Sequence, residues 1–104
     1  MNHVICKAIA NRQQLRLSYS GWHRLVEPHA YGLGRGRCEV VRAWQVEDCV
    51  GFDGRLGWHL DPAGWKLLRV DEIRLLALLP NPVPEPRPDY RRGDKDIWLI
   101  YCQF

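Results

Sequence analysis

The sequence predicts an all-β fold with one N-terminal helix: a small five-stranded barrel followed by a C-terminal strap. A short amphipathic segment comes first, and runs of alternating apolar and polar residues follow it. Clusters rich in Gly, Asp and Pro separate these runs, as turns separate strands. From residue 80 onward, prolines alternate with other residues before an apolar end.

The helix is predicted over residues 2–12. Its apolar face, at helical spacing, consists of Val4, Ile5, Ala8 and Ile9. Asn11 is suited to end it. Burial of this face predicts that the helix packs across one opening of the barrel.

Five strands are predicted after the helix, at residues 14–19, 24–31, 37–47, 65–70 and 74–79. Pro28 places the second strand at an edge or at a bulge. The glycine-rich segment 32–36 is interpreted as a hairpin turn rather than a phosphate loop, because a strand follows it instead of a helix. Residues 48–64 are predicted to form a loop, and residues 70–73 a single helical turn. One helix followed by five short strands is typical of SH3-like and Sm-like barrels.

The third strand carries one charge on an otherwise apolar face. Its even positions are Cys38, Val40, Arg42, Trp44 and Val46, which share a face in strand geometry. Two interpretations of Arg42 stay open. It either forms a structural pair with Glu27 or a carbonyl, or lies at the mouth of the barrel and binds an anion.

The C-terminal segment, residues 80–104, is predicted to belong to the same structural unit as the barrel of residues 1–79. Its alternating prolines favour a stiff, extended strap. The run from Ile97 to Cys102 contains no charge, so it should dock as a strand, with Trp98 and Ile100 in an apolar groove.

Composition excludes several classes of protein. The chain of 104 residues is one domain with ordinary globular content, 46% hydrophobic and 26% charged. A net charge of +3 is too small to predict non-specific binding to duplex DNA. Neither a membrane span nor a signal peptide is present, so we expect a cytoplasmic protein. The four cysteines form no Cys-x-x-Cys pair, so reduced thiols are expected, with a zinc site as the alternative.

No arrangement of residues predicts catalysis. Ser18 and Ser20 are the only serines, and nothing local fixes Cys49 near His59. We therefore predict a protein that is not an enzyme and has no catalytic residue, metal or cofactor.

Residues 19–31 instead predict a binding surface. This short stretch contains an arginine, two histidines, two tyrosines and a tryptophan. Arginine suits phosphate, and aromatic rings stack on bases, so the stretch indicates a flat anionic ligand such as a nucleotide.

Several blocks in a fixed order resemble the WYL domain. They are Tyr19, Arg24 ahead of Val26-Glu27-Pro28-His29, then Arg42-Ala43-Trp44, and Gly64-Trp65-Lys66-Leu67-Leu68-Arg69-Val70-Asp71-Glu72-Ile73. The resemblance covers roughly residues 4–79. The tripeptide that names the family is absent, since Cys38-Glu39-Val40 follows Gly36-Arg37. That departure resembles a short, stand-alone branch of the family.

The resemblance implies a small SH3-like or Sm-like fold and a ligand-sensing role in bacterial regulators of defence or stress. Such domains usually accompany a winged helix that binds DNA, so it also implies a separate DNA-binding protein as partner. The implied ligand is a nucleotide or single-stranded nucleic acid. Its predicted site consists of Tyr19, Arg24, His29, Tyr31, Arg42, Trp44, Lys66 and Arg69. The alternative is a structural or protein-interaction module that assembles through its apolar C-terminal segment, for example as a homodimer.

Overall fold

The computed structural model describes residues 1–104, except for the side chain of Asp53. Helix α1 spans His3–Asn11, and the strands are β1 (Gln13–Tyr19), β2 (Trp22–Leu33), β3 (Glu39–Gln45), β4 (Cys49–Asp53), β5 (Gly57–Asp61), β6 (Gly64–Arg69), β7 (Arg74–Pro82) and β8 (Leu99–Gln103). Two short 3₁₀ helices, Arg35–Arg37 and Val70–Glu72, join β2 to β3 and β6 to β7. The prediction of a mostly β fold with one N-terminal helix is confirmed.

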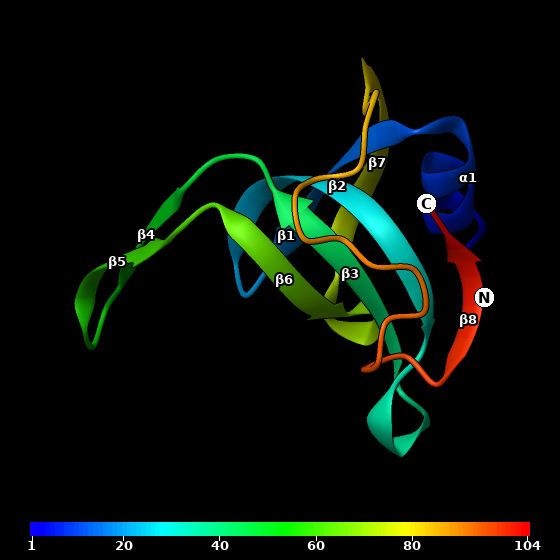
Figure 1. Cartoon of the computed structure of the whole chain (residues 1–104). Helices are drawn as coiled ribbons and strands as arrows, with labels where there is room; N and C mark the ends of the chain where they lie inside the picture. Colours follow the sequence, from blue (N-terminus) through cyan, green and yellow to red (C-terminus); the bar gives the residue numbers. More distant parts are fainter.

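The main sheet is antiparallel and strongly curved (Figure 1). Its strands lie in the order β6-β3-β2-β1-β7, and β8 adds to β2. These first five are the five strands that the sequence predicts. Within the described residues, no pairing between the outer strands β6 and β7 closes the sheet into a barrel.

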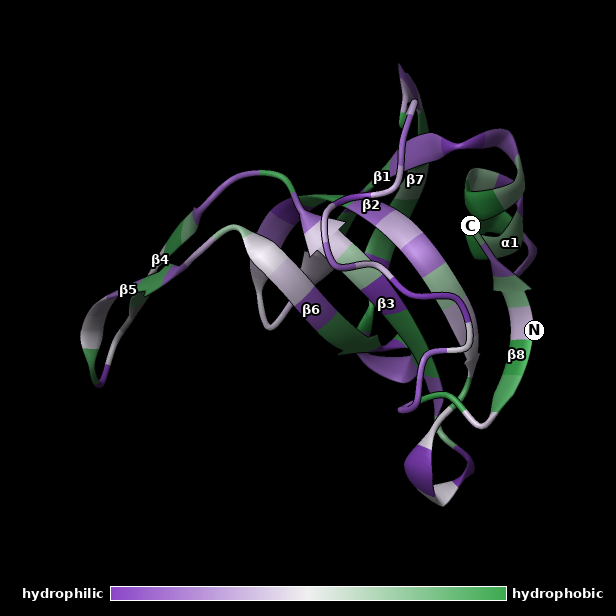
Figure 2. Ribbon diagram, viewed as in Figure 1, coloured by the Kyte–Doolittle hydropathy of each residue, from purple (hydrophilic) through white to green (hydrophobic). Residues whose placement is uncertain are grey.

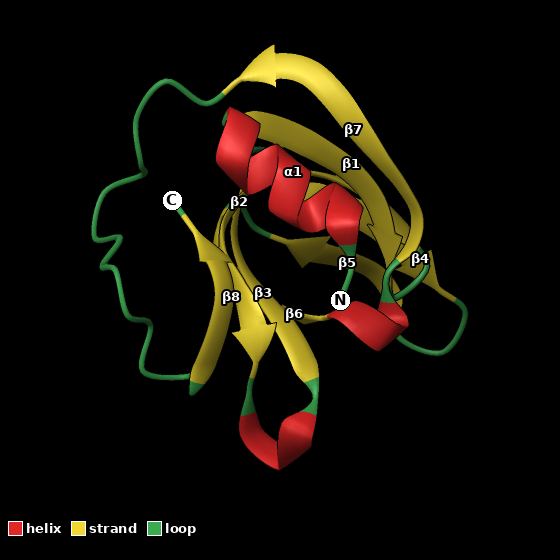
Figure 3. Ribbon diagram, turned by 90° about the vertical axis from the view of Figure 1, so that its right-hand side faces the viewer, coloured by secondary structure: helices red, strands yellow, loops and turns green.

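Helix α1 packs against β1, β2 and β7 on one face of this sheet (Figure 3). It begins at Asn2, whose side-chain oxygen accepts hydrogen bonds from the first turn, and ends at Arg12 with a left-handed φ of 54°. Ile5, Ala8 and Ile9 are buried as predicted. Val4 is 40% exposed, so the buried face is narrower than expected. At roughly 1.5–3 kcal/mol for each large buried side chain, this face supplies a few kcal/mol of stability.

Strand β2 connects most of the sheet. Its first half pairs with β1 and its second half with β8, while β3 lies along its other edge. The pairing with β3 shifts between Pro28 and Ala30, so the predicted bulge at Pro28 is confirmed. Close approach of β8 requires glycine at position 32, because a Cβ there would lie 2.0 Å from the carbonyl oxygen of Leu99.

The prediction of a loop over residues 48–64 is wrong, because this segment forms strands. It contains a second, two-stranded sheet, β4 paired with β5, which projects from the body as a hairpin (Figure 1). Apolar residues alternate with other residues in both strands, but the glycines and aspartates among them led to the prediction of a loop. The strand predicted over residues 37–47 is also shorter than expected, because residues 35–37 form a 3₁₀ turn.

Residues 83–98, here called the strap, cross the face of the sheet opposite to α1. Val41 and Ala43 of β3 pack with the helix residues, whereas the alternate residue Arg42 contacts the strap. The strap is anchored at its two ends by Val83 and Ile97, which are 2% and 3% exposed. The prediction that Trp98 docks in a groove is wrong: it is 65% exposed, because its neighbour Ile97 takes the buried position.

A disulfide between Cys6 and Cys102 ties α1 to β8. The expectation of reduced thiols is therefore wrong for these two cysteines, whose Cα atoms the fold brings to 5.8 Å. Cys38 and Cys49 are free. No helix within the described residues is long and apolar enough to cross a membrane.

Candidate ligand-binding site

The structure divides the eight predicted site residues among three places. The first group, His29, Arg42 and Trp44, lies on the strap face of the sheet. All three contact residues of the strap, but of the three only Arg42 also lines the cavity beneath it. They are the part of the predicted site that the structure brings together.

The second group, Tyr19, Arg24, Lys66 and Arg69, lies elsewhere. Arg24 is 7% exposed and forms an ion pair with Asp61, which also accepts a 2.7 Å hydrogen bond from Lys66. Burial alone would raise the pKa of Asp61, but these hydrogen bonds outweigh it and hold the pKa below its usual value. Arg69 contacts Tyr19 through its backbone N–H, which donates to the phenol oxygen at 3.1 Å. Arg24 and Lys66 thus form ion pairs at the base of the β4–β5 hairpin, and Arg69 forms one with Asp71 at the end of β6.

Tyr31 belongs to neither group. It is fully buried among the residues under α1, where its hydroxyl donates to Glu39 and accepts from the backbone N–H of Asn2. Burial and the Glu39 contact raise its pKa. The bulge at Pro28–Ala30 explains this position, because one extra residue in β2 reverses the faces of all that follow. Tyr31 thus points toward the helix although His29 points toward the strap.

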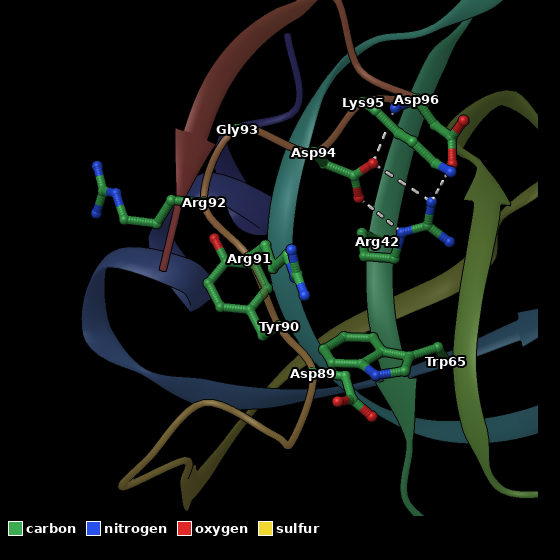
Figure 4. Close-up of a pocket in the computed structure, with 10 residues that line it drawn as sticks. All are labelled: Arg42, Trp65, Asp89, Tyr90, Arg91, Arg92, Gly93, Asp94, Lys95 and Asp96. Atoms are coloured by element: carbon green, nitrogen blue, oxygen red, sulfur yellow. Dashed lines mark hydrogen bonds and ion pairs between the residues drawn. The ribbon is translucent and has the colours of Figure 1, made fainter.

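Arg42 lies between two carboxylates of the strap (Figure 4). Its Nε donates to Asp94 Oδ2 at 2.7 Å and one Nη to Asp96 Oδ2 at 2.6 Å. The hydrogen bond to Asp94 raises the pKa of Arg42. Burial alone would raise the pKa of Asp94, but Arg42 reverses this and lowers it. Arg42 is therefore a paired cation, and the expectation that Glu27 or a carbonyl is its partner is wrong.

Glu27 pairs with Arg87 of the strap instead. Arg87 Nε donates to Glu27 Oε1 at 2.5 Å, and Gln14 donates to the other carboxylate oxygen at 2.9 Å. The Arg87 guanidinium also lies over the ring of Trp44, 5.4 Å from its centroid. Burial opposes ionisation of Glu27, but Arg87 and Gln14 outweigh it and lower the pKa.

His29 is fully buried and holds the strap through its neutral form. Its Nε2 accepts a 3.1 Å hydrogen bond from the backbone N–H of Arg87, so its Nδ1–H must donate to Glu27 O at 2.8 Å. Burial lowers the pKa of His29. Its ring is surrounded by Trp65, Tyr90 and Phe104, with centroids 4.8–5.2 Å away. His29 thus supports the strap from below and is shielded from any ligand.

A cavity of about 530 Å³ lies between the strap and strands β3 and β6. Its lining residues are Arg42, Trp65, Asp89, Tyr90, Arg91, Arg92, Gly93, Asp94, Lys95 and Asp96. Four of these are cationic. Among the described residues, Arg91, Arg92 and Lys95 form no ion pair, and of these three Arg92 donates a hydrogen bond to the carbonyl oxygen of Phe104. The rings of Trp65 and Tyr90 lie 6.2 Å apart and only 32° from parallel. The cavity therefore combines two aromatic rings with exposed cations, of which Arg91 and Lys95 have neither an ion-pair nor a hydrogen-bond partner among the described residues.

Sequence reasoning missed most of this lining. Trp65 could have been found, because its place opposite Trp44 follows from pairing β6 with β3. Tyr90, Arg91 and Lys95 lie in a stretch that the sequence presents only as polar, and no local pattern places it over the sheet. The sequence also carried no sign that residues 83–98 would form one wall of the cavity.

Comparisons with protein families, curated proteins and solved structures find no match to this chain. No three His, Cys, Asp or Glu side chains of the described residues are grouped so that they could hold a metal ion.

Proposed function

We propose that this chain is a WYL-like ligand-binding module that binds a nucleotide or a short single strand of nucleic acid in the cavity beneath the strap. One observation carries the proposal: Arg91 and Lys95, both unpaired with described residues, share a cavity with the rings of Trp65 and Tyr90. Cations and stacking platforms are the two parts that single-stranded nucleic-acid sites combine. The cavity volume of about 530 Å³ falls in the usual range for small ligands.

The chemistry is recognition without turnover. Arg91 and Lys95 contact phosphates, and a base stacks against Trp65 or Tyr90. Catalysis is not part of the proposal, because the sequence presents no recognised catalytic arrangement. Incubation with ATP or an oligonucleotide should leave both intact, and release of phosphate or shortening of the strand would contradict this part of the proposal.

Asp94 and Asp96 limit this site in a specific way. Both form ion pairs with the guanidinium of Arg42, which the sequence predicts as the centre of the site. A phosphate gains Arg42 only by displacing these carboxylates, so the first contacts fall to Arg91 and Lys95. Replacing both aspartates with asparagine should free Arg42 and strengthen binding.

The test is a titration of labelled oligo-dT of eight nucleotides, and of ATP, at 20 mM NaCl. The variant with Arg91→Ala and Lys95→Ala should bind at least tenfold more weakly. Its slope of log affinity against log salt should fall by about 1.4, because each lost contact to a single strand contributes about 0.7.

A matched control removes two exposed cations outside the cavity, Lys7→Ala and Arg16→Ala. It carries the same net charge as the cavity variant and should retain wild-type binding. Equal losses in the two variants would show charge attraction without a site. Absence of any binding by the wild type at low salt would overturn the proposal.

The wider setting is also proposed. As the resemblance implies, the module would work in bacterial regulation of defence or stress, with a separate DNA-binding protein as partner. We further propose that its curved sheet is an opened variant of the SH3-like or Sm-like barrel. The cytoplasmic location stays a prediction, and the disulfide gives it a direct test, because cytosolic proteins usually keep their thiols reduced.

A further inference from the structure

The projecting β4–β5 hairpin has one face made only of apolar side chains. Val50 pairs with Leu60 and Phe52 pairs with Trp58, and Leu56 lies in the connecting turn. These five residues are 60–74% exposed. Green stretches mark β4 and β5 in Figure 2. We call these five residues the hairpin face.

The opposite side of the hairpin fixes this face in place. A Cβ on Gly51 would lie 2.0 Å from the indole of Trp22, so the ring packs directly on the hairpin backbone. The ring of His59 also lies 6.1 Å from that indole. Because the inner side meets β2, most of the hairpin face points away from the body, and only Phe52 also borders a hollow with Trp22 and His59. Its exposure therefore follows from the packing of the chain.

The outer side of the hairpin lacks the cover that such an element needs. Its sheet contains only β4 and β5. An isolated two-stranded hairpin is marginally stable in water, and a covered apolar face is what makes it stable. An apolar surface this concentrated marks a contact site on a soluble domain.

Charge distinguishes between the candidate occupants. Residues 49–61 contain Asp53 and Asp61 but only one basic residue, Arg55. Anionic lipid surfaces and nucleic acids bind elements rich in Lys and Arg, which this hairpin is not. The hairpin face itself carries no charge. An equally uncharged apolar protein surface is the complementary partner.

The exposed area of the hairpin face favours a second copy of this chain as its binding partner. Phe52 and Trp58 expose roughly 100–180 Å² each, and the three aliphatic side chains roughly 40–90 Å² each. One hairpin face therefore offers roughly 500 Å². Two faces together reach roughly 1,000 Å², the size at which a specific interface is expected.

We propose that two copies of this chain form a two-fold dimer by packing their hairpin faces together. In such a dimer each copy presents the same patch, and the aromatic pair of one meets the aliphatic or aromatic pair of the other. None of the five residues lines the cavity under the strap. The dimer therefore stands or falls independently of the proposed ligand.

The experiment is sedimentation velocity of the full chain from 1 to 200 µM. The wild type should approach twice the monomer mass as concentration rises. Trp58→Ser should weaken dimerisation at least tenfold, since central aromatic residues dominate such interfaces. Leu60→Lys is a second disruption that leaves the aromatic pair in place. Far-UV circular dichroism of both variants should match the wild type.

Trp98→Ser is the matched control, because Trp98 is also 65% exposed but lies on the strap. It should dimerise as the wild type does. A wild type that stays monomeric at 200 µM would overturn the proposal, as would a dimer unchanged by both hairpin variants. Flotation with phosphatidylglycerol vesicles tests the other occupant: lipid binding lost in Trp58→Ser, with a monomeric wild type, would assign the face to membranes.

Discussion

Arg42→Ala should loosen the strap and lower the stability of the whole chain. The Asp94 side chain is only 10% exposed, so removal of Arg42 leaves a nearly buried carboxylate without its cation. A charge-assisted hydrogen bond in this setting is worth about 1.5–3 kcal/mol. Asp96 is 47% exposed and adds little, because water screens its pair. We therefore expect a loss of about 2 kcal/mol, or about 8–16 °C in Tm for a domain of this size.

The loss should depend on pH in a defined direction. In the wild type the pKa of Asp94 lies below its usual value, so this pair contributes stability above the unfolded-state pKa near 3.8. That contribution disappears as the pH falls through the folded-state pKa. The difference between wild type and Arg42→Ala should thus be largest near pH 7 and shrink below pH 4.

The assay is thermal and urea unfolding, monitored by circular dichroism, of Arg42→Ala, of Asp94→Asn and of the variant that carries both substitutions. Adding Asp94→Asn to Arg42→Ala removes the stranded charge and should recover at least 1 kcal/mol, which a double-mutant cycle measures. A Tm change below 2 °C for Arg42→Ala would refute the reasoning, and so would additive effects in the double variant.

Three further predictions concern other parts of the fold. Acidification from pH 7.5 to 5 should lower Tm, because the unfolded chain takes up a proton at His29 near pH 6.5 while burial lowers the pKa of His29 in the folded chain. His29→Gln should make Tm less dependent on pH. An equally steep dependence in this variant would refute the role of neutral His29 in holding the strap. Gly32→Ala should cost more than about 2 kcal/mol, since its Cβ would lie 2.0 Å from Leu99 O, and should make the strap sensitive to limited proteolysis. Alkylation in denaturant without reductant should label only Cys38 and Cys49 if the disulfide is present in cells, whereas four labelled thiols would support the cytoplasmic prediction.

Sequence pattern predicted the five strands β1, β2, β3, β6 and β7 of the main sheet, whereas β8 was indicated by an uncharged apolar run. Period-two alternation also placed Arg42 and Trp44 correctly on one face of β3, because that strand is regular. It failed for Tyr31, since parity predicts that this residue shares a face with His29. The extra residue at the bulge reverses that parity. Pro28 indicates an edge or a bulge, but only the pairing with β3 shows that a residue is inserted there and that the following side chains change face.

The partners of the charged residues could not be predicted for a similar reason. Arg42 pairs with Asp94, which is 52 positions away, and Arg87 with Glu27, 60 positions away. Such pairs depend on where the strap crosses the sheet. Proline alternation indicates that the segment is extended, but an extended segment has no intrinsic direction. Its path is set by the buried anchors at its two ends.

The disulfide decides what kind of motion the strap can make. With Cys102 bound to Cys6, the strap is tied to the sheet through β7 at one end and to α1 at the other. A segment attached at both ends in this way cannot leave the sheet at either end unless one of these attachments breaks. Reduction of that bond would remove this covalent link, so that β8, and with it the end of the strap, would depend on its backbone pairing with β2 and its packing against α1.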